Sequence, residues 1–299
     1  MSTQPTISII ICNRTDSLNP QLAENINQTI GCEYEPIIIN NGQNKYNIFE
    51  AYNYAVEQAH GQILCFMHDD LDFHSVGWGK QVADAFAADE KLGLIGITGG
   101  QFMPCTPCSY WEGGAHCGQV IQSETKNNVA HKEPRKEGKA VEQPTDVVAV
   151  DGMWMCIRAD LFRKGLRWDD MNFHKFHCYD LDICFQILEM GMKVQVIPEV
   201  LIEHKSTGTT DLVYLEQNQL FFEKWKHRLP IMRGCELSDK EIEQRTEMVR
   251  MMRMYLRFYL KTAAELKQTQ SSKAYLLGKF LLNPRGYFKM KKKIKNNKY

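Results

Sequence analysis

The chain has 299 residues, of which 43% are hydrophobic and 24% charged. This is enough to bury the core of one large α/β domain that carries an appendage, or the cores of two modest domains. The formal net charge is zero, but the last fifteen residues contain only basic charges (Arg285, Lys289, Lys291, Lys292, Lys293, Lys295 and Lys298). This distribution argues against nucleic-acid binding by the body of the protein and favours an anionic partner at the C-terminal end.

The first third of the chain alternates predicted strands and helices. Apolar, β-branched runs at 7–11, 34–40 and 63–67 predict buried strands, and residues 18–30 and 47–59 carry apolar side chains at helical spacing. This order predicts a Rossmann-like, mixed but mostly parallel sheet flanked by helices. In such sheets, ligands bind at the carboxyl ends of the strands.

Polar residues follow each of these three strands. They are Cys12, Asn13 and Arg14, then Asn40 and Asn41, then His68, Asp69, Asp70 and Asp72. On their own, the aspartates fit a solvated polar turn better than a site. Their position at one sheet edge favours the alternative, in which they hold a hard cation such as Mg²⁺ or Mn²⁺ through oxygen. The chain contains no glycine-rich dinucleotide motif and no P-loop.

The central part of the chain predicts a helix at 78–88 and a strand at 92–98, followed by an irregular segment at 101–146. A connection of that length is typical of a lid or a mobile loop. Within it, Cys105, Cys108 and Cys117 have partial zinc-ligand spacing, although free thiols are the favoured interpretation. A strand then ends at Asp151 and Gly152.

The next segments predict a helix that begins near Tyr179, a strand at 192–197 and a helix at 212–225. Asp180 and Asp182 lie in the first turn of the helix that begins near Tyr179, where the helix dipole stabilises a carboxylate or where they cap the helix. We expect a catalytic domain at 1–232 and a helical extension with a basic, amphipathic tail at 233–299.

These residues resemble the family 2 glycosyltransferases of bacterial type, which have the A-type nucleotide-sugar-binding fold. The resemblance covers roughly residues 6–228 and is most specific from Ala51 to Asp70, where the family has a helix with an asparagine, a glycine and a strand that ends in an Asp-x-Asp type metal motif. The segment Tyr179-Asp180-Leu181-Asp182 is similar to the family's Glu-Asp-x-Asp motif. Asn41 and Tyr179 depart from the usual aspartate and glutamate.

The resemblance implies a role for each matching residue. Asp180 acts as the catalytic base, with Asp182 as the alternative, and Asp70, Asp72 and His204 hold Mn²⁺ or Mg²⁺. The nucleotide sugar contacts Cys12, Asn13, Arg14, Asn41, Asn53, Asp69 and Asp70, and the acceptor side includes Asp151, Gly152 and Trp154. His68 is assigned to packing or to an outer position around the metal.

The expected function is therefore metal-dependent, inverting transfer of a sugar from a UDP- or GDP-linked donor to a hydroxyl group. The acceptor would be a glycan, a lipid-linked molecule or an envelope polysaccharide precursor. A nucleotidyltransferase and a non-catalytic sugar-nucleotide-binding protein remain as alternatives.

We expect a cytoplasmic protein with reduced cysteines, because the sequence has neither a secretion signal nor a membrane-spanning apolar run. Its basic tail is interpreted as a peripheral contact with an anionic membrane on the inner face. Solvated lysines and RNA binding are the other interpretations of the tail.

Overall fold

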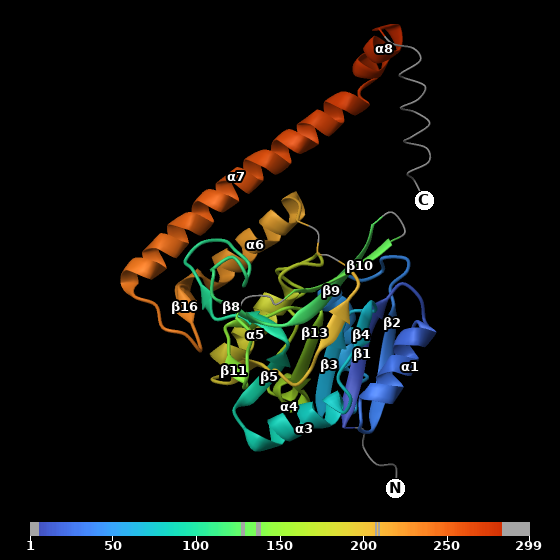
Figure 1. The fold of residues 1–299 in the computed structure, drawn as a ribbon, viewed down its shortest axis with the longest axis vertical. Helices are drawn as coiled ribbons and strands as arrows, with labels where there is room; N and C mark the ends of the chain where they lie inside the picture. Colours follow the sequence, from blue (N-terminus) through green and yellow to red (C-terminus); the bar gives the residue numbers. More distant parts are fainter. Residues whose placement is uncertain (1–5, 127–128, 136–138, 207, 209, 283–299) are drawn as a thin grey trace. The chain divides into compact units, whose positions relative to one another are not determined.

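The computed structural model describes residues 6–126, 129–135, 139–206, 208 and 210–282. The chain forms two compact units, which divide between Arg250 and Met251. The first unit has a mixed α/β architecture built on one large sheet (Figure 1). This is the fold class that the sequence predicted.

The large sheet has seven strands. Their spatial order is β11 (Thr145–Asp146), β14 (Lys193–Val196), β5 (Leu92–Gly96), β13 (Trp154–Arg158), β3 (Ile63–Met67), β1 (Ile7–Asn13) and β2 (Tyr34–Asn40). β13 runs antiparallel to both of its neighbours and β11 runs antiparallel to β14, whereas the other strands are parallel. The parallel strands β1, β2 and β3 therefore end at the same edge of the sheet.

Helices cover both faces of the large sheet. One face packs against α1 (Pro20–Thr29) and α3 (Trp78–Ala88). The other packs against α2 (Ile48–Val56), α4 (Ala159–Arg163), α5 (Tyr179–Glu189) and α6 (Leu212–Trp225), which continues into the 3₁₀ turn η1 (Lys226–Arg228). Successive side chains of β1 enter the two cores in turn, with Ile9 on one side and Ile10 on the other. A strand buried on both faces has a continuous apolar sequence for this reason.

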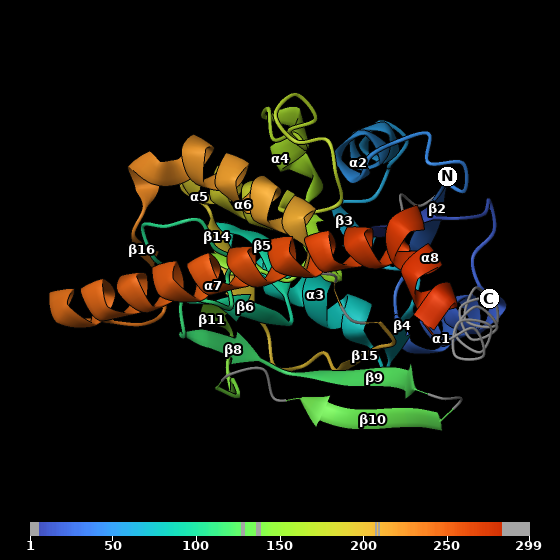
Figure 2. The same cartoon turned by 90° about the horizontal axis from the view of Figure 1, so that it is seen from above.

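A second sheet contains β10 (Val129–Arg135), β9 (Val120–Lys126), β15 (Ile202–His204) and β4 (Leu71–Phe73), in that order (Figure 2). The expectation of an irregular segment at 101–146 was therefore wrong for β9 and β10. β9 and β10 pair with each other over seven residue pairs, but their sequences contain few apolar residues. β9 also pairs with β15, which lies far along the chain. Pairing with a distant strand leaves little local sequence signal.

Two smaller sheets complete the first unit. One joins β12 (Ala149–Val150), β6 (Thr98–Gly100) and β8 (His116–Gly118), and the other joins β16 (Ile231–Met232) and β7 (Phe102–Met103). A Cβ atom at Gly99 or Gly100 would clash with the backbone oxygen of Ala149 or Tyr110. Gly99 lets β12 approach and Gly100 lets the backbone at Tyr110 approach, and β12 ends directly before Asp151.

The C-terminal helices are α7 (Asp239–Ser271), which runs through the division between the units, and α8 (Lys273–Leu282). The second unit leaves large apolar side chains of α7 exposed, among them Met254, Tyr255 and Phe258. None of the helices in the described ranges is long and apolar enough to span a membrane. The basic residues from Arg285 onward lie outside the described residues.

Asn53 of α2 joins this helix to the segment before α5. Its side chain donates hydrogen bonds to Trp168 O at 2.8 Å and to Asp170 Oδ2 at 3.1 Å, and it accepts one from Trp168 N at 3.1 Å. Trp168 is buried against Tyr52 and Phe66. Asn53 therefore fixes a buried backbone segment.

We expect Asn53→Ala to lower the free energy of unfolding by about 2–3 kcal/mol, because it leaves buried backbone groups of Trp168 without partners. Urea unfolding followed by tryptophan fluorescence measures the change. Gln58→Ala is the control, since the exposed Gln58 side chain donates to Tyr54 O, four residues earlier in the chain, and its loss should change stability by less than about 0.5 kcal/mol. Equal effects of the two substitutions would contradict the prediction.

Candidate functional site

The ends of β1 and β2 are tied to each other. The register places Asn13 beside Asn40, and Asn41 N donates a hydrogen bond to Asn13 O at 2.6 Å. The Asn41 side chain accepts from Tyr46 N at 2.9 Å and donates to Tyr46 O at 2.8 Å. Asn41 thus closes the loop that follows β2.

The loop after β1 is shaped by Asn13, which donates to Ser17 O at 2.8 Å and accepts from Arg14 N at 2.8 Å. The Arg14 side chain is exposed. Burial raises the pKa of the Cys12 thiol, a hydrogen bond with Asn41 opposes this shift, and the carboxylate of Asp69 adds to it. The structure therefore brings Cys12, Asn13, Asn41 and Asp69 to one edge of the sheet.

His68, Asp70 and His204 meet at the carboxyl end of β3, and one ligand atom from each lies within 4.8 Å of the others. Nδ1 of His68 is 3.4 Å from Nε2 of His204, which is 3.5 Å from Oδ1 of Asp70. Ser206 Oγ lies 3.3 Å from Nε2 of His204. Two imidazoles and one carboxylate thus converge from the connection between β3 and β4 and from β15.

The Asp70 carboxylate suits a cation. Burial raises its pKa, but contacts with His204 and with the Ser206 hydroxyl outweigh burial and lower the pKa to about 2. Oδ1 is buried and, among the residues that the structure describes, receives no hydrogen bond. An ionised oxygen of this kind beside two imidazoles fits a divalent metal ion. His68, which the sequence assigned to packing or to an outer position, belongs to this group.

Asp72 does not join Asp70 and His204. In the pairing of β4 with β15, Asp72 lies opposite Glu203, and Leu71 lies opposite His204. Successive side chains of a strand point to opposite faces, so Glu203 and His204 diverge. The predicted ligand set Asp70, Asp72 and His204 is thus divided between two faces of the strand pair.

Asp151 and Asp180 form a pair of neighbouring carboxylates. Asp151 follows β12, and its carboxylate accepts hydrogen bonds from Met153 N and from the Tyr110 hydroxyl, each at 2.8 Å. Burial and, second, the charge of Asp151 raise the pKa of Asp180 to about 7. The helix dipole would lower this pKa, but desolvation and like-charge repulsion are stronger here.

Tyr179 connects the carboxylate pair to the histidines. Its buried hydroxyl lies 2.9 Å from Nε2 of His68. A Cβ atom at position 152 would clash with that hydroxyl, so Gly152 makes room for it. Cys178, directly before α5, has a left-handed backbone with φ of 64°, which is uncommon for a residue other than glycine. Tyr179, which departs from the family motif, is thus a contact that sequence reasoning missed.

Asp182 is 1% exposed and is fully engaged within the protein. It accepts hydrogen bonds from Trp225 Nε1 at 2.8 Å and from Gln186 Nε2 at 2.7 Å, and Lys224 Nζ lies 2.7 Å from its Oδ1. These contacts fasten α6 to α5. Although it is two residues from Asp180, Asp182 does not share its surroundings.

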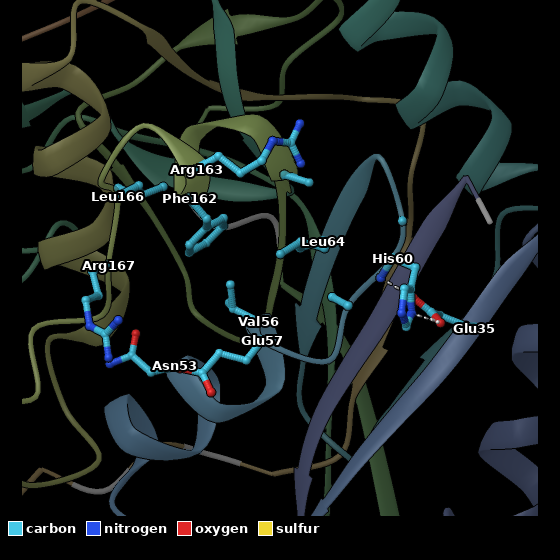
Figure 3. A pocket seen from close by; sticks show the side chains of 13 residues that line it. Glu35, Asn53, Val56, Glu57, His60, Leu64, Phe162, Arg163, Leu166 and Arg167 are labelled. Carbon is cyan, nitrogen blue, oxygen red and sulfur yellow. Dashed lines mark hydrogen bonds and ion pairs between the residues drawn. The ribbon is translucent and has the colours of Figure 1, made fainter. Parts of the chain in front are cut away.

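Trp154 and Asn53 also lie apart from the strand-end group. Trp154 is completely buried between the sheet and α1 and α3, with its ring against Trp78. Asn53 lines a cavity of about 870 Å³. Figure 3 shows Arg167 near Asn53 and Glu57 on one side of this cavity, and His60 paired with Glu35 on the other. Of the site residues predicted from the sequence, Asn53 alone lines it.

Comparison with known proteins gives one extensive family match. The model of a glycosyltransferase-like family matches residues 8–225. This range includes the ends of β1, β2 and β3, the group around Asp70, and the pair Asp151 and Asp180. No curated protein is significantly similar to the chain.

Many solved structures are similar to the chain, and two of them illustrate the low sequence identity. The crystal structure of GalNAc-T7 with UDP, GalNAc and Mn²⁺ has 12% identity and a TM-score of 0.43, over 84% of this chain and 55% of that one. A197 from STIV has 10% identity and a TM-score of 0.38, over 67% of this chain and 86% of that one. The chain thus spans about half the length of the first of these proteins.

We expect Asp70→Asn to weaken Mn²⁺ binding at least roughly tenfold, because a neutral amide oxygen is a poorer ligand than a carboxylate. Asp182→Asn should leave Mn²⁺ affinity unchanged but destabilise the fold by about 1–3 kcal/mol, because it weakens the buried hydrogen bonds from Trp225 and Gln186 and removes one of the two carboxylates that pair with Lys224. Isothermal titration and urea unfolding of both variants test this separation. Weaker Mn²⁺ binding by Asp182→Asn alone would reverse the two assignments.

Proposed function

Because the chain belongs to the glycosyltransferase-like family, we propose that it transfers a sugar from a nucleoside-diphosphate donor at the edge formed by β1, β2 and β3. The observation that carries this proposal is the convergence of His68, Asp70 and His204 beside the pair Asp151 and Asp180. The group of two histidines and Asp70 suits a cation that neutralises the diphosphate. The carboxylate pair suits removal of the proton from the acceptor hydroxyl. The family match favours this reaction over nucleotidyl transfer and over binding alone.

On the donor side, His68, Asp70 and His204 would hold the cation. When bound, Mn²⁺ or Mg²⁺ neutralises the charge that develops on the diphosphate leaving group. The two imidazoles favour Mn²⁺, since Mg²⁺ prefers oxygen ligands. Cys12, Asn13, Arg14, Asn41 and Asp69 surround the donor's nucleoside in this proposal, with the two asparagines shaping the loops that receive it.

On the acceptor side, Asp180 accepts the proton of the attacking hydroxyl. A base with a pKa near 7 is half ionised at neutral pH and still basic enough to take a proton. Asp151 maintains this pKa by its negative charge, and Tyr110 and Met153 N fix its orientation. Direct attack on the donor sugar inverts its configuration, so we propose an inverting enzyme. Asp182 serves the fold instead.

The acceptor in this proposal is a glycan or a lipid-linked molecule. The exposed apolar side chains of α7 support a peripheral contact of residues 233–299 with an anionic membrane. UDP and GDP are the proposed donor nucleotides.

The transfer rate should rise about tenfold per pH unit below pH 7 and level off above it, because only ionised Asp180 takes the proton. Asp151→Asn removes the repelling charge, so the midpoint of this rise should move to lower pH. Initial rates at saturating donor between pH 5 and 9 measure both midpoints. A midpoint that Asp151→Asn leaves unchanged would contradict the pairing of the two carboxylates.

Asp180→Asn should lower the rate by a factor of roughly 10² to 10⁴ and raise Tm at pH 8. The raised pKa of Asp180 means that the folded state holds this proton more tightly than the unfolded state. The bound proton therefore stabilises the fold fully at low pH, and this stabilisation is lost as pH rises through about 7. The amide of the variant carries no charge, so the variant should keep a higher Tm at pH 8. Full activity of Asp180→Asn would exclude Asp180 as the base.

A thermal-shift screen of UDP- and GDP-linked sugars tests the donor assignment. We expect stabilisation by at least one donor in the presence of Mn²⁺, and a smaller shift or none in the presence of a chelator. His204→Ala should abolish the part of the stabilisation by the donor that depends on Mn²⁺. If no sugar nucleotide stabilises the protein in the presence of the metal, the proposal is refuted.

A further inference from the structure

β4 and β15 present a second group of metal-ligand side chains, on the face opposite His204. Asp72, His74 and Glu203 each offer one ligand atom, and these atoms lie within 4.8 Å of one another. The strand register places Asp72 directly opposite Glu203. His74 follows Asp72 by two residues, so its side chain faces the same way. The backbone N–H of His74 donates a hydrogen bond to Leu201 O at 2.9 Å. The backbone itself therefore gathers the three side chains.

The charge and burial of this outer set favour a cation. Glu203 is 2% exposed, and its Oε2 lies 3.3 Å from Nε2 of His74. Within the part of the chain that the structure describes, no lysine or arginine forms an ion pair with Asp72. The register brings these two carboxylates, one half-buried and one buried, to the same face of the strand pair, where their negative charges repel each other. A divalent cation neutralises both carboxylates at once.

We propose that Asp72, His74 and Glu203 bind a divalent cation of the Zn²⁺ or Mn²⁺ type, at a site separate from His68, Asp70 and His204. Two carboxylates and one imidazole are ligands that both metals accept. The His74 side chain is 38% exposed, so water has access to complete the coordination.

The outer cation would tie β4 to β15. These two strands also present the inner group, since Asp70 immediately precedes β4 and His204 ends β15. Asp70 O accepts a hydrogen bond from Lys205 N at 3.1 Å, which continues the strand pairing past both groups. A cation on the outer face therefore holds Asp70 and His204 at the correct separation without contacting a substrate.

The test counts metal ions bound to the full chain. The protein is stripped with a chelator, incubated with Zn²⁺ or Mn²⁺, desalted and analysed by mass spectrometry for bound metal per chain. We expect two ions for the unaltered chain, one for His74→Ala, one for His204→Ala and none for the double variant. His60→Ala is the matched control, because His60 pairs with Glu35 at 3.2 Å and belongs to neither ligand group. It should keep two ions.

Thermal unfolding gives a second readout. At a hundredfold excess over Kd, the outer cation should raise the Tm of His204→Ala by about 5 °C, and the further substitution His74→Ala should remove that increase. Should His74→Ala fail to fold, Asp72→Asn preserves side-chain volume and gives the same two readouts.

The outcomes separate this inference from the proposed function. Equal metal content and equal metal affinity in His74→Ala and the unaltered chain would overturn the outer site, whatever His204→Ala does. Loss of one ion in His74→Ala, with none lost in His204→Ala, would support the outer site and count against the catalytic metal group.

Discussion

The pairing of β4 with β15 is the interaction on which the candidate site depends. Asp70 and His204 are far apart in the chain, and they come within 3.5 Å because Leu71 lies opposite His204 in that pairing. Bringing distant segments together costs chain entropy, which grows only slowly with loop length. The apolar side chains of Leu71, Phe73 and Ile202, all buried in one core, offset that cost.

The surroundings shift the pKa values of two carboxylates of the site in opposite directions. Asp70 faces imidazoles and a hydroxyl, and its pKa falls to about 2. Asp180 faces another carboxylate in a desolvated position, and its pKa rises to about 7. Paired groups with separated pKa values are the usual arrangement for dividing electrostatic and proton-transfer roles. Tyr179 joins the two regions through His68.

Several polar residues near the site serve the protein's own backbone and packing. Asn41 and Asn53 satisfy buried or loop backbone groups, and Asp182 fastens α6 to α5. In a sequence, an amide that binds a ligand and an amide that satisfies the backbone look alike, because both are polar residues beside apolar runs. Burial and hydrogen-bond partners distinguish them, and those depend on residues far away in the chain.

The sequence by itself determined the parallel strands, the helices that flank them and the edge where Asp69 and Asp70 lie. These follow from local periodicity, since a strand buried on both faces must be apolar throughout. The tertiary structure alone decided that His68 joins Asp70, that Asp72 turns away and that β9 is a strand. The positions of His204 and Asp72 depend on the pairing of β4 with β15, and strand register between distant segments leaves no local trace. β9 pairs along its length with β10, its neighbour in sequence, but the polar side chains of both strands hide that pairing from the apolar pattern.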